Sequence, residues 1–330
     1  MTTRFVLACG ALAAIVLATT ASDQWPDHQA PHPMTAGPGP TAAARPAAGR
    51  SSGQALAKPD CNPQNLRASL RPQGPLPVPG QMPVGSTMAG IARRGYLIVG
   101  VNRDAQGFSF RDENLRLQGF EVDIVRDIAE AIFGDRERVV FRQLSIADRL
   151  KIAKSGEVDL VVATATITCK RREEVDFSAA YFETGQRVLV NRGSGFTDLA
   201  SLTGHPICAP RGSTGLETIQ AATLKLIPVS ASATTDCLAL LQLGKVDAVC
   251  TNDALLAHMI AQDPRTEIVG PQLSHESYGV AISKNTPDLG RFVNAVLERR
   301  AQDGRWRASY ERWLTLLGPP PSPPTPQYQD

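Results

Sequence analysis

One arginine in the middle of the chain is a candidate anion-binding residue. Arg171 lies inside the charged run of residues 170–174 (KRREE). A guanidinium offers parallel N–H donors that match the two oxygens of a carboxylate. Arg171 is therefore a candidate partner for a carboxylate ligand. Its alternative role is a solvated surface charge, because the run carries both signs.

A second candidate lies about forty residues further on, in the segment Arg211-Gly212-Ser213-Thr214. A glycine-led turn that opens a helix presents unpaired backbone N–H groups to an anion. A phosphate-binding loop is the competing interpretation, but it requires a lysine that this segment lacks. The segment is therefore predicted to contact an anion other than a nucleotide phosphate.

The sequence offers little material for catalysis or metal binding. No Ser-His-Asp order, nucleophile elbow or Cys-x-x-Cys motif is present, and the five histidines are scattered. We therefore expect no cofactor, no metal site and no enzymatic activity. A formal net charge of +2 without a basic block gives no indication of nucleic-acid binding.

These candidates need elements to position them, and the hydrophobic pattern predicts strands alternating with helices. The first half of the folded region has strands at 96–101, 139–144 and 158–163, with helices at 120–132 and 147–155. The second half has strands at 205–209, 227–229 and 246–250, with helices from 212–220 and 235–243. The order β-α-β-α-β predicts a mostly parallel sheet with helices on its faces.

Both halves share a local signature: the end of a helix, a glycine, a polar residue, then Val-Asp and an apolar strand. It occurs at residues 155–161 (SGEVDLV) and 243–249 (LGKVDAV). Two similar α/β units in one chain predict two lobes with a cleft between them. Parallel crossings are expected near Tyr181 to Gly185 and near Glu276 to Tyr278, where they form a hinge. A helix over 289–302 is expected to return to the first lobe.

Composition divides the chain sharply. Thirteen of the 25 prolines lie in residues 22–85 and six more in 319–326. We expect a Pro/Ala-rich tether at 22–85, a folded body of residues 86–318 and a proline-rich tail at 319–330. The body divides into lobe 1 (residues 86–185 and 276–318) and lobe 2 (residues 186–275).

The N-terminus has the form of an export signal. Arg4 precedes an apolar stretch from Phe5 to Ala18, and small residues follow before Ser22, which predicts a signal peptide at 1–21. The protein is then extracytoplasmic, in the periplasm or cell envelope. Cleavage and release, an uncleaved anchor and a lipid anchor stay open, because the only early cysteine, Cys9, lies inside the apolar stretch.

An ordered set of motifs in residues 91–318 resembles a known family. The segments are 119–124 (GFEVDI), 166–171 (TITCKR) with 175–178 (VDFS), 278–282 (YGVAI) and 303–306 (DGRW). In this order they resemble the polar amino-acid-binding proteins of ABC importers, solute-binding protein family 3. The glutamine/glutamate-binding lipoproteins are the most similar group. The resemblance implies the type II periplasmic-binding-protein fold, with two α/β lobes and a two-strand hinge.

The resemblance also assigns roles at the site. Arg171 and Thr166 would hold the α-carboxylate of an amino acid, with Ser213 and Thr214 meeting it across the cleft. The carbonyl of Thr164 would accept from the α-ammonium. Further contacts to the ligand would come from Asn102, Arg103 and Ile146; Arg103 either favours an acidic side chain or points to water.

One departure from the family pattern concerns the ammonium. The position that aligns with the expected aspartate holds Asn252, and Asp253 follows it. Either Asp253 takes the role after a small shift, or Asn252 binds through its amide oxygen. The alternative role of Asp253 is a helix N-cap.

Export places the cysteines in an oxidising compartment, and five of them lie outside the signal. On the fold that the resemblance implies, Cys208 and Cys237 are within reach, and we expect a disulfide there. Cys61 is a candidate partner for Cys169, which would leave Cys250 free. The pairing of these three stays open.

The functional expectation is a monomeric receptor that closes on glutamine, glutamate, aspartate or asparagine and presents it to an ABC importer's membrane subunits. The alternative is a sensor that presents the same closed form to a membrane signalling protein, since both need the same cleft. A dehydratase of the same fold is a remote third possibility.

Overall fold

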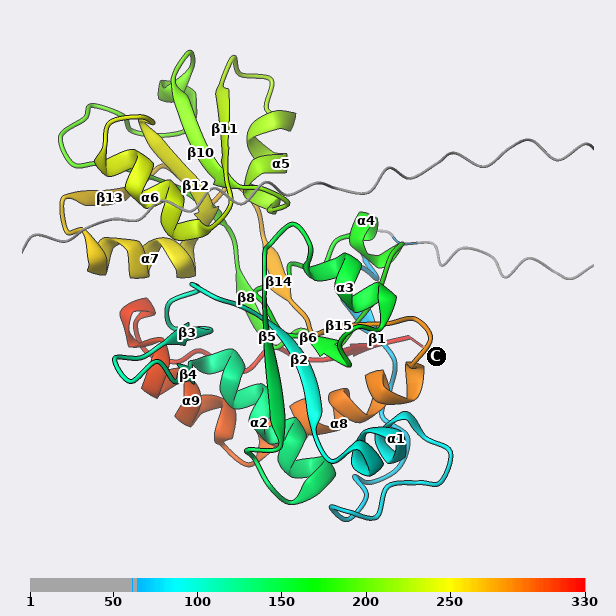
Figure 1. The fold of residues 1–330 in the computed structure, drawn as a ribbon. Helices are drawn as coiled ribbons and strands as arrows, with labels where there is room; N and C mark the ends of the chain where they lie inside the picture. Colours follow the sequence, from blue (N-terminus) through cyan, green and yellow to red (C-terminus); the bar gives the residue numbers. More distant parts are fainter. Residues whose placement is uncertain (1–60, 62–63, 330) are drawn as a thin grey trace, which may run out of the picture. The chain divides into compact units, whose positions relative to one another are not determined.

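The computed structural model describes Cys61 and residues 64–329 (Figure 1). The predicted signal peptide, most of the predicted tether and Cys9 lie outside the described residues. The described chain contains two five-stranded sheets, joined by the two-stranded pair of β8 (Phe182–Thr184) and β14 (Glu276–Tyr278). Both chain crossings of the hinge were expected at these positions.

The sheet of lobe 1 has the order β5-β2-β6-β15-β7. Its strands are β2 (Leu97–Asn102), β5 (Val139–Leu144), β6 (Leu160–Val161), β7 (Asp176–Phe177) and β15 (Ala281–Ile282). β2 runs parallel to β5 and β6, whereas β15 is antiparallel to β6 and β7. The three parallel strands are those that the β-α-β-α-β pattern predicted.

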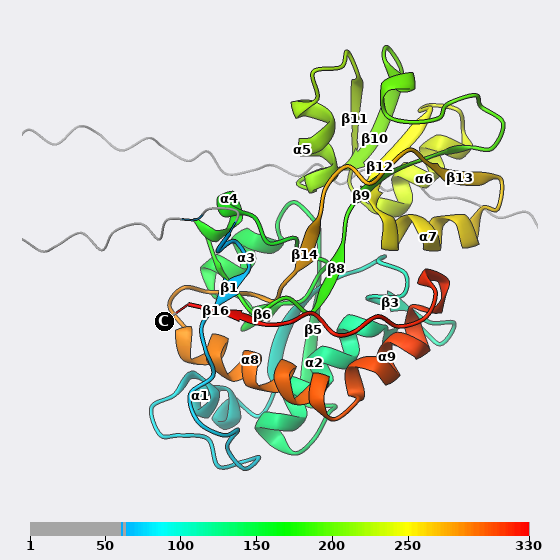
Figure 2. The ribbon, with the colours of Figure 1, turned by 180° about the vertical axis from the view of Figure 1, so that it is seen from behind.

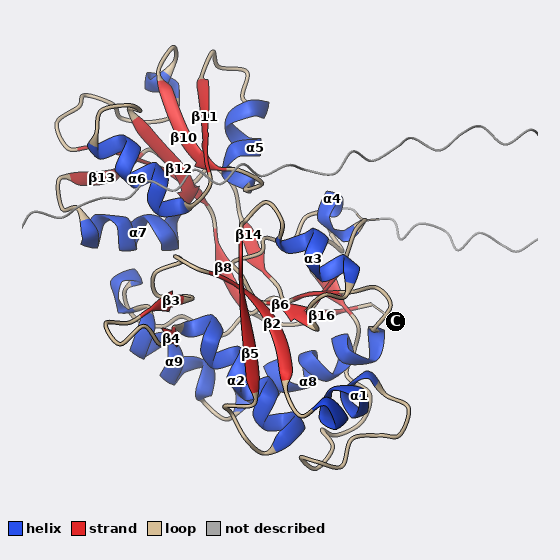
Figure 3. Ribbon diagram, in the orientation of Figure 1, coloured by secondary structure: helices blue, strands red, loops and turns tan. Residues whose placement is uncertain are grey.

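Helices cover both faces of this sheet (Figure 3). They are α1 (Thr87–Arg94), α2 (Phe120–Phe133), α3 (Arg149–Ser155), α4 (Cys169–Arg172), α8 (Pro287–Gln302) and α9 (Arg305–Trp313). Successive strand residues point to opposite faces. Leu160 and Val162 accordingly join a core with α2 and α8, whereas Val161 and Ala163 join a core with α3. A short hairpin of β3 (Phe110–Arg111) and β4 (Leu117–Gln118) precedes α2.

Lobe 2 repeats the plan with the strand order β11-β10-β12-β9-β13. Its strands are β9 (Gln186–Asn191), β10 (Pro206–Pro210), β11 (Ile227–Ala231), β12 (Ala248–Asn252) and β13 (Thr266–Val269). Its helices are α5 (Thr214–Ala221), α6 (Thr234–Gln242) and α7 (Asp253–Gln262), with a 3-10 turn, η1 (Ala200–Leu202). The parallel strands β11, β10 and β12 form one side of the sheet, and β9, on the other side, is antiparallel to both β12 and β13. Both sheets are therefore mixed, with three parallel strands at one side.

The N- and C-terminal segments pack on lobe 1 more closely than their composition suggested. β1 (Ala68–Ser69), from the segment assigned to the tether, pairs in parallel with β16 (Gln327–Tyr328), from the proline-rich tail (Figure 2). Asn294 on α8 donates to Ser69 Oγ and to the Leu70 carbonyl. The 3-10 turn η2 (Thr315–Leu317) leads into the tail. Backbone pairing of this kind leaves no trace in composition.

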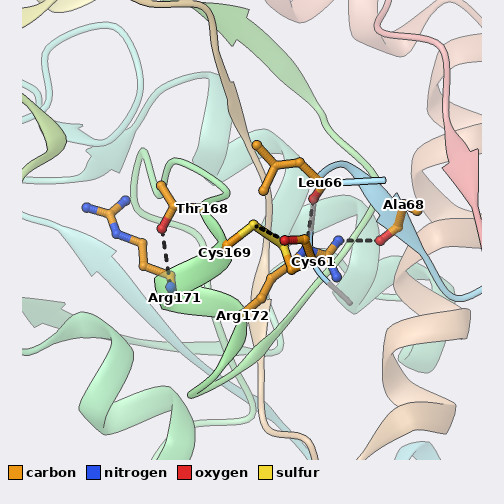
Figure 4. The surroundings of a disulfide bond; sticks show 7 residues. All are labelled: Cys61, Leu66, Ala68, Thr168, Cys169, Arg171 and Arg172. Atoms are coloured by element: carbon orange, nitrogen blue, oxygen red, sulfur yellow. Dashed lines mark hydrogen bonds between the residues drawn. A yellow bond between two sulfur atoms is a disulfide. The ribbon is translucent and has the colours of Figure 1, made fainter. Parts of the chain in front are cut away.

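The described chain contains two disulfides. Cys208 on β10 bonds Cys237 on α6, which confirms the expected pairing. Cys61 bonds Cys169 at the start of α4 (Figure 4), and Cys250 is free and buried. The open pairing of the three remaining cysteines is thereby decided.

Candidate functional site

Arg171 occupies the point where the two lobes meet. The short helix α4 begins after its N-cap Thr168, whose hydroxyl accepts from the Arg171 backbone N–H. The side chain is 5 % exposed, and its guanidinium donates to the Thr166 carbonyl at 2.8 Å and to the Gly212 carbonyl of lobe 2 at 3.0 Å. Burial lowers the pKa of Arg171, while the charges of Glu217 and Glu276 act in the opposite direction. The guanidinium is therefore a bridge between lobes and not a solvated charge.

No acidic side chain neutralises this guanidinium directly. Among the described residues, no carboxylate oxygen lies within 4.0 Å of Arg171. Lys170, its neighbour, does form an exposed ion pair across the lobes with Glu217 at 2.9 Å. A buried cation without a counter-ion is costly. Arg171 is thus a buried cation without a direct ion pair among the described residues.

Figure 4 shows that Arg171 and Arg172 leave α4 in different directions. Arg172 donates to the carbonyls of Leu66 and Ala68, beside the Cys61–Cys169 disulfide. The two adjacent arginines therefore have separate functions. Arg172 holds the N-terminal segment through hydrogen bonds to its backbone, whereas Arg171 faces the junction of the lobes.

Glycine makes the close approach of lobe 2 possible. Gly212 has a φ of +75°, and a Cβ there would lie 2.8 Å from the Cα of Ala147 in lobe 1. Ser213 caps α5 by accepting from the Leu216 N–H, and Thr214 follows at the first turn. The predicted Gly-led segment therefore meets Arg171 through the Gly212 carbonyl.

A cluster of polar side chains lies at the same junction. Thr166 Oγ1 and Thr214 Oγ1, from opposite lobes, are 3.5 Å apart, and both donate to Glu276 Oε2, at 2.8 and 3.1 Å. Asn252, 5 % exposed, donates to the same oxygen at 2.8 Å. Gln186 donates to Thr214 Oγ1 and to Glu276. The structure thus brings Arg171, Thr166, Thr214 and Asn252 together.

Asp253 is oriented differently from Asn252. Its carboxylate accepts from Thr184 Oγ1 at 2.5 Å and from the Ala254 backbone N–H. It lines a cavity of about 430 Å³ with Tyr310 and residues of the C-terminal tail. Asn252, rather than Asp253, joins the polar cluster. The alternative role of Asp253 as a helix N-cap is wrong, because Asp253 is the first residue of α7 and the N-cap position is held by Asn252, without a side-chain capping bond.

Two other predicted residues, Asn102 and Thr164, contact each other. Asn102, at the end of β2, donates to Thr164 Oγ1 at 2.7 Å, and its own Oδ1 has no partner among the described residues. Thr164 has a φ of +44°, which is strained for a residue with a Cβ. The Thr164 carbonyl already accepts from Arg149 at 3.3 Å.

Two further predicted residues, Ile146 and Arg103, differ in exposure. Ile146 is buried, and Arg103 is exposed. Arg103 lines a cavity of about 700 Å³ with Asp104 of lobe 1 and Thr235 and His258 of lobe 2. Asp104 also accepts from the Thr235 hydroxyl at 2.9 Å, a further contact between the lobes.

Sequence reasoning missed several residues at the site. Glu121 accepts from the Thr164 N–H at 2.5 Å and from the Tyr181 hydroxyl, and burial raises its pKa to about 7. Burial lowers the pKa of Arg149 to about 9. Glu276 was placed only in a hinge crossing, and Gln186 was not singled out. Glu276 and Gln186 could have been found from their positions at the hinge, because polar side chains at a crossing lie next to both lobes.

The chain matches the family model described as bacterial extracellular solute-binding proteins, family 3, over residues 97–316. The chain belongs to this family. The glutamine-binding protein of an ABC transporter from Bacillus subtilis is 31 % identical over 230 residues, which cover 69 % of this chain and 84 % of the relative. The glutamine-binding protein of Geobacillus stearothermophilus is 32 % identical over 203 residues, covering 61 % and 78 %.

Solved structures give the same fold for this solute-binding protein. The L-cysteine solute receptor of Neisseria gonorrhoeae superposes with a TM-score of 0.68 at 29 % identity, covering 71 % of this chain and 96 % of that one. The fold is therefore the type II periplasmic-binding-protein fold that the motifs implied. Within the described residues there is no helix long and apolar enough to cross a membrane, and no cluster of three or more metal-ligating side chains.

Proposed function

We propose that this solute-binding protein is the amino-acid receptor of an ABC importer. Its ligand is a polar amino acid of the glutamine, glutamate, aspartate or asparagine class. Its lobes comprise residues 86–185 with 276–318, and 186–275. The observation that carries the proposal is the buried Arg171 guanidinium, which bonds carbonyls of both lobes and has no carboxylate partner among the described residues.

The chemistry of a free amino acid fits this arrangement. Its carboxylate supplies the charge that Arg171 lacks, and contact with both lobes makes binding favour the closed form. Thr166 and Thr214 offer hydroxyls beside Arg171, with Ser213 at the start of α5. We expect Asn102, Thr164 and Ile146, all buried, to contact the ligand from lobe 1, and the exposed Arg103 to lie at the margin of the site. The relatives support the ligand class, since two relatives that are 31 % and 32 % identical are named for glutamine.

The protein acts as a receptor and not as an enzyme, because its function is completed by closure and delivery. It is exported and works outside the cytoplasm as a monomer, with the importer's membrane subunits as its partners. The family description as extracellular supports this location.

Isothermal titration of the full oxidised chain tests the proposal. The panel contains glutamine, glutamate, asparagine and aspartate, with cysteine and arginine added because solved neighbours bind them. We expect one amino acid to bind with a Kd near 1 μM, about 8 kcal/mol. Arg171→Ala is expected to cost about 2–5 kcal/mol of binding free energy.

Arg172→Ala is the matched control. It removes an arginine from the same helix that also donates to two backbone carbonyls, but on the side away from the lobe junction. We expect it to leave the Kd unchanged. A panel in which no amino acid binds would refute the proposal, and equal losses in both variants would remove Arg171 from the site.

A further inference from the structure

Glu276 places a carboxylate at the junction of the lobes. It is the first residue of β14, one of the two hinge strands, and it is half-buried. Its Oε2 accepts from four side chains, and its Oε1 accepts from Ser274 Oγ at 3.3 Å. The four donors to Oε2 are Thr166 (2.8 Å), Asn252 (2.8 Å), Thr214 (3.1 Å) and Gln186 (3.2 Å). Donors from both lobes therefore converge on one oxygen of a hinge residue.

All of these donors are neutral. Among the described residues, no lysine, arginine or histidine nitrogen lies within 4.0 Å of the Glu276 carboxylate. Hydrogen bonds orient a carboxylate, but its charge is balanced only by a cation. Glu276 therefore has no direct ion-pair partner among the described residues, and neither does Arg171, although the charge of Glu276 acts to raise the pKa of Arg171.

Thr166 links these two unpaired charges. Its carbonyl accepts from Arg171, and its hydroxyl donates to Glu276. An amino acid carries its carboxylate and its ammonium on the same α-carbon, so its two charges also lie close together. A cation and an anion thus contact the same residue, as the two charges of a zwitterion share one α-carbon.

The position at which the family pattern places an aspartate also points to Glu276. Asn252 stands there, and a neutral amide cannot balance an ammonium. Its Nδ2 instead donates to Glu276, which fixes the carboxylate beside Asn252. Asp253 cannot supply the charge from its present orientation, because it bonds Thr184 and Ala254.

We propose that the Glu276 carboxylate is the counter-ion of the bound amino acid's α-ammonium, in place of the aspartate that Asn252 replaces. Asn252 and Gln186 position it through their amides. The inference rests on the proposed function, because it names the partner of the ligand's second charge. It assigns a binding role to the hinge itself.

The test is titration of Glu276→Gln with L-glutamine, L-glutamate, L-asparagine and L-aspartate. The amide keeps the size of the side chain and removes its charge. Loss of the charge partner is expected to weaken binding of the tightest-binding amino acid by about 30-fold or more. Glu183→Gln is the matched control, since Glu183 lies on the other hinge strand, is exposed and pairs with Arg67. It is expected to bind as the unchanged protein does.

A second variant separates a charge role from a structural one. Adding Asn252→Asp to Glu276→Gln returns a carboxylate to the site from a neighbouring position, and we expect at least a tenfold recovery of affinity. If Glu276 only maintained the shape of the hinge, the added Asn252→Asp substitution would not restore affinity. Circular dichroism and the Tm of each variant confirm that it folds.

The outcomes distinguish this inference from the proposed function. Binding of an amino acid that survives Glu276→Gln unchanged overturns the inference alone. Tighter binding in Glu276→Gln also overturns it, because Glu276 would then compete with the ligand's carboxylate. Loss without rescue by Asn252→Asp assigns Glu276 a structural role and overturns it too. An unchanged protein that binds no amino acid overturns both proposals.

Discussion

The contact between Gly212 and Ala147 predicts that one added methyl group will hinder lobe closure. Gly212 has a φ of +75°, and the Cβ of Gly212→Ala would lie 2.8 Å from the Ala147 Cα and 3.3 Å from its nitrogen. The neighbour is backbone and cannot rotate away, so the lobes have to separate. Restoring an ordinary contact of 3.4 Å requires a shift of 3.4 − 2.8 = 0.6 Å.

This shift is large enough to break the bridge that Arg171 forms. Its Nη2 lies 3.0 Å from the Gly212 carbonyl, and a displacement of 0.6 Å along that direction gives 3.6 Å, beyond a hydrogen bond. A bond from a charged donor contributes about 1.5–3 kcal/mol. The Kd for the amino acid should therefore rise about 10- to 100-fold.

Gly193→Ala provides the control for backbone strain. Gly193 has a φ of +73° in the same lobe, and a Cβ there meets nothing within 4 Å. Both alanine variants should lose about 1–2 kcal/mol of unfolding free energy, measured by urea denaturation, because both adopt a left-handed conformation. Only Gly212→Ala should lose affinity by titration calorimetry. A Kd within threefold of the unchanged protein would refute the reasoning about closure.

Three further predictions concern buried groups. Because the folded pKa of Glu121 (about 7) exceeds the ordinary 4.5, its contribution to stability is complete below pH 4.5 and is lost as the pH rises to 7. Relative to Glu121→Gln, the protein should lose up to about 3 kcal/mol across that window in urea unfolding, and parallel profiles would contradict this. Replacing Cys208 and Cys237 together by alanine should cost about 3–4 kcal/mol in the same assay, because their bond closes a loop with a separation of 29 residues; a loss below about 1 kcal/mol would be inconsistent with that entropy. Burial raises the pKa of Cys250 to about 12, so in a Cys9→Ser background no thiol should react with a disulfide reagent at pH 8 until denaturant is added. Rapid labelling of the native protein would contradict it.

Local patterns in the sequence determined the elements, the fold family and part of the site. The periodicity of residues 120–132 predicted α2, and the two Val-Asp repeats predicted two similar lobes, because burial of one face leaves a repeating signal. The motif around Arg171 identified it because bidentate recognition of a carboxylate requires a guanidinium. The pairing of Cys208 with Cys237 followed once the fold was implied.

Only the tertiary structure decided which side chains share the site. Glu276 lies 110 residues from Thr166 in the chain, yet they are hydrogen-bonded, and the choice between Asn252 and Asp253 depended on the direction in which each side chain leaves the end of β12. The packing of residues 64–85 on lobe 1, the strand pair β1–β16 and the Cys61–Cys169 bond are equally long-range. Hydrogen bonds between neutral side chains and backbone pairing require proximity rather than a residue pattern. The sequence therefore predicted an anionic partner for Arg171, whereas the neighbours of Glu276 depended on how the hinge brings both lobes together.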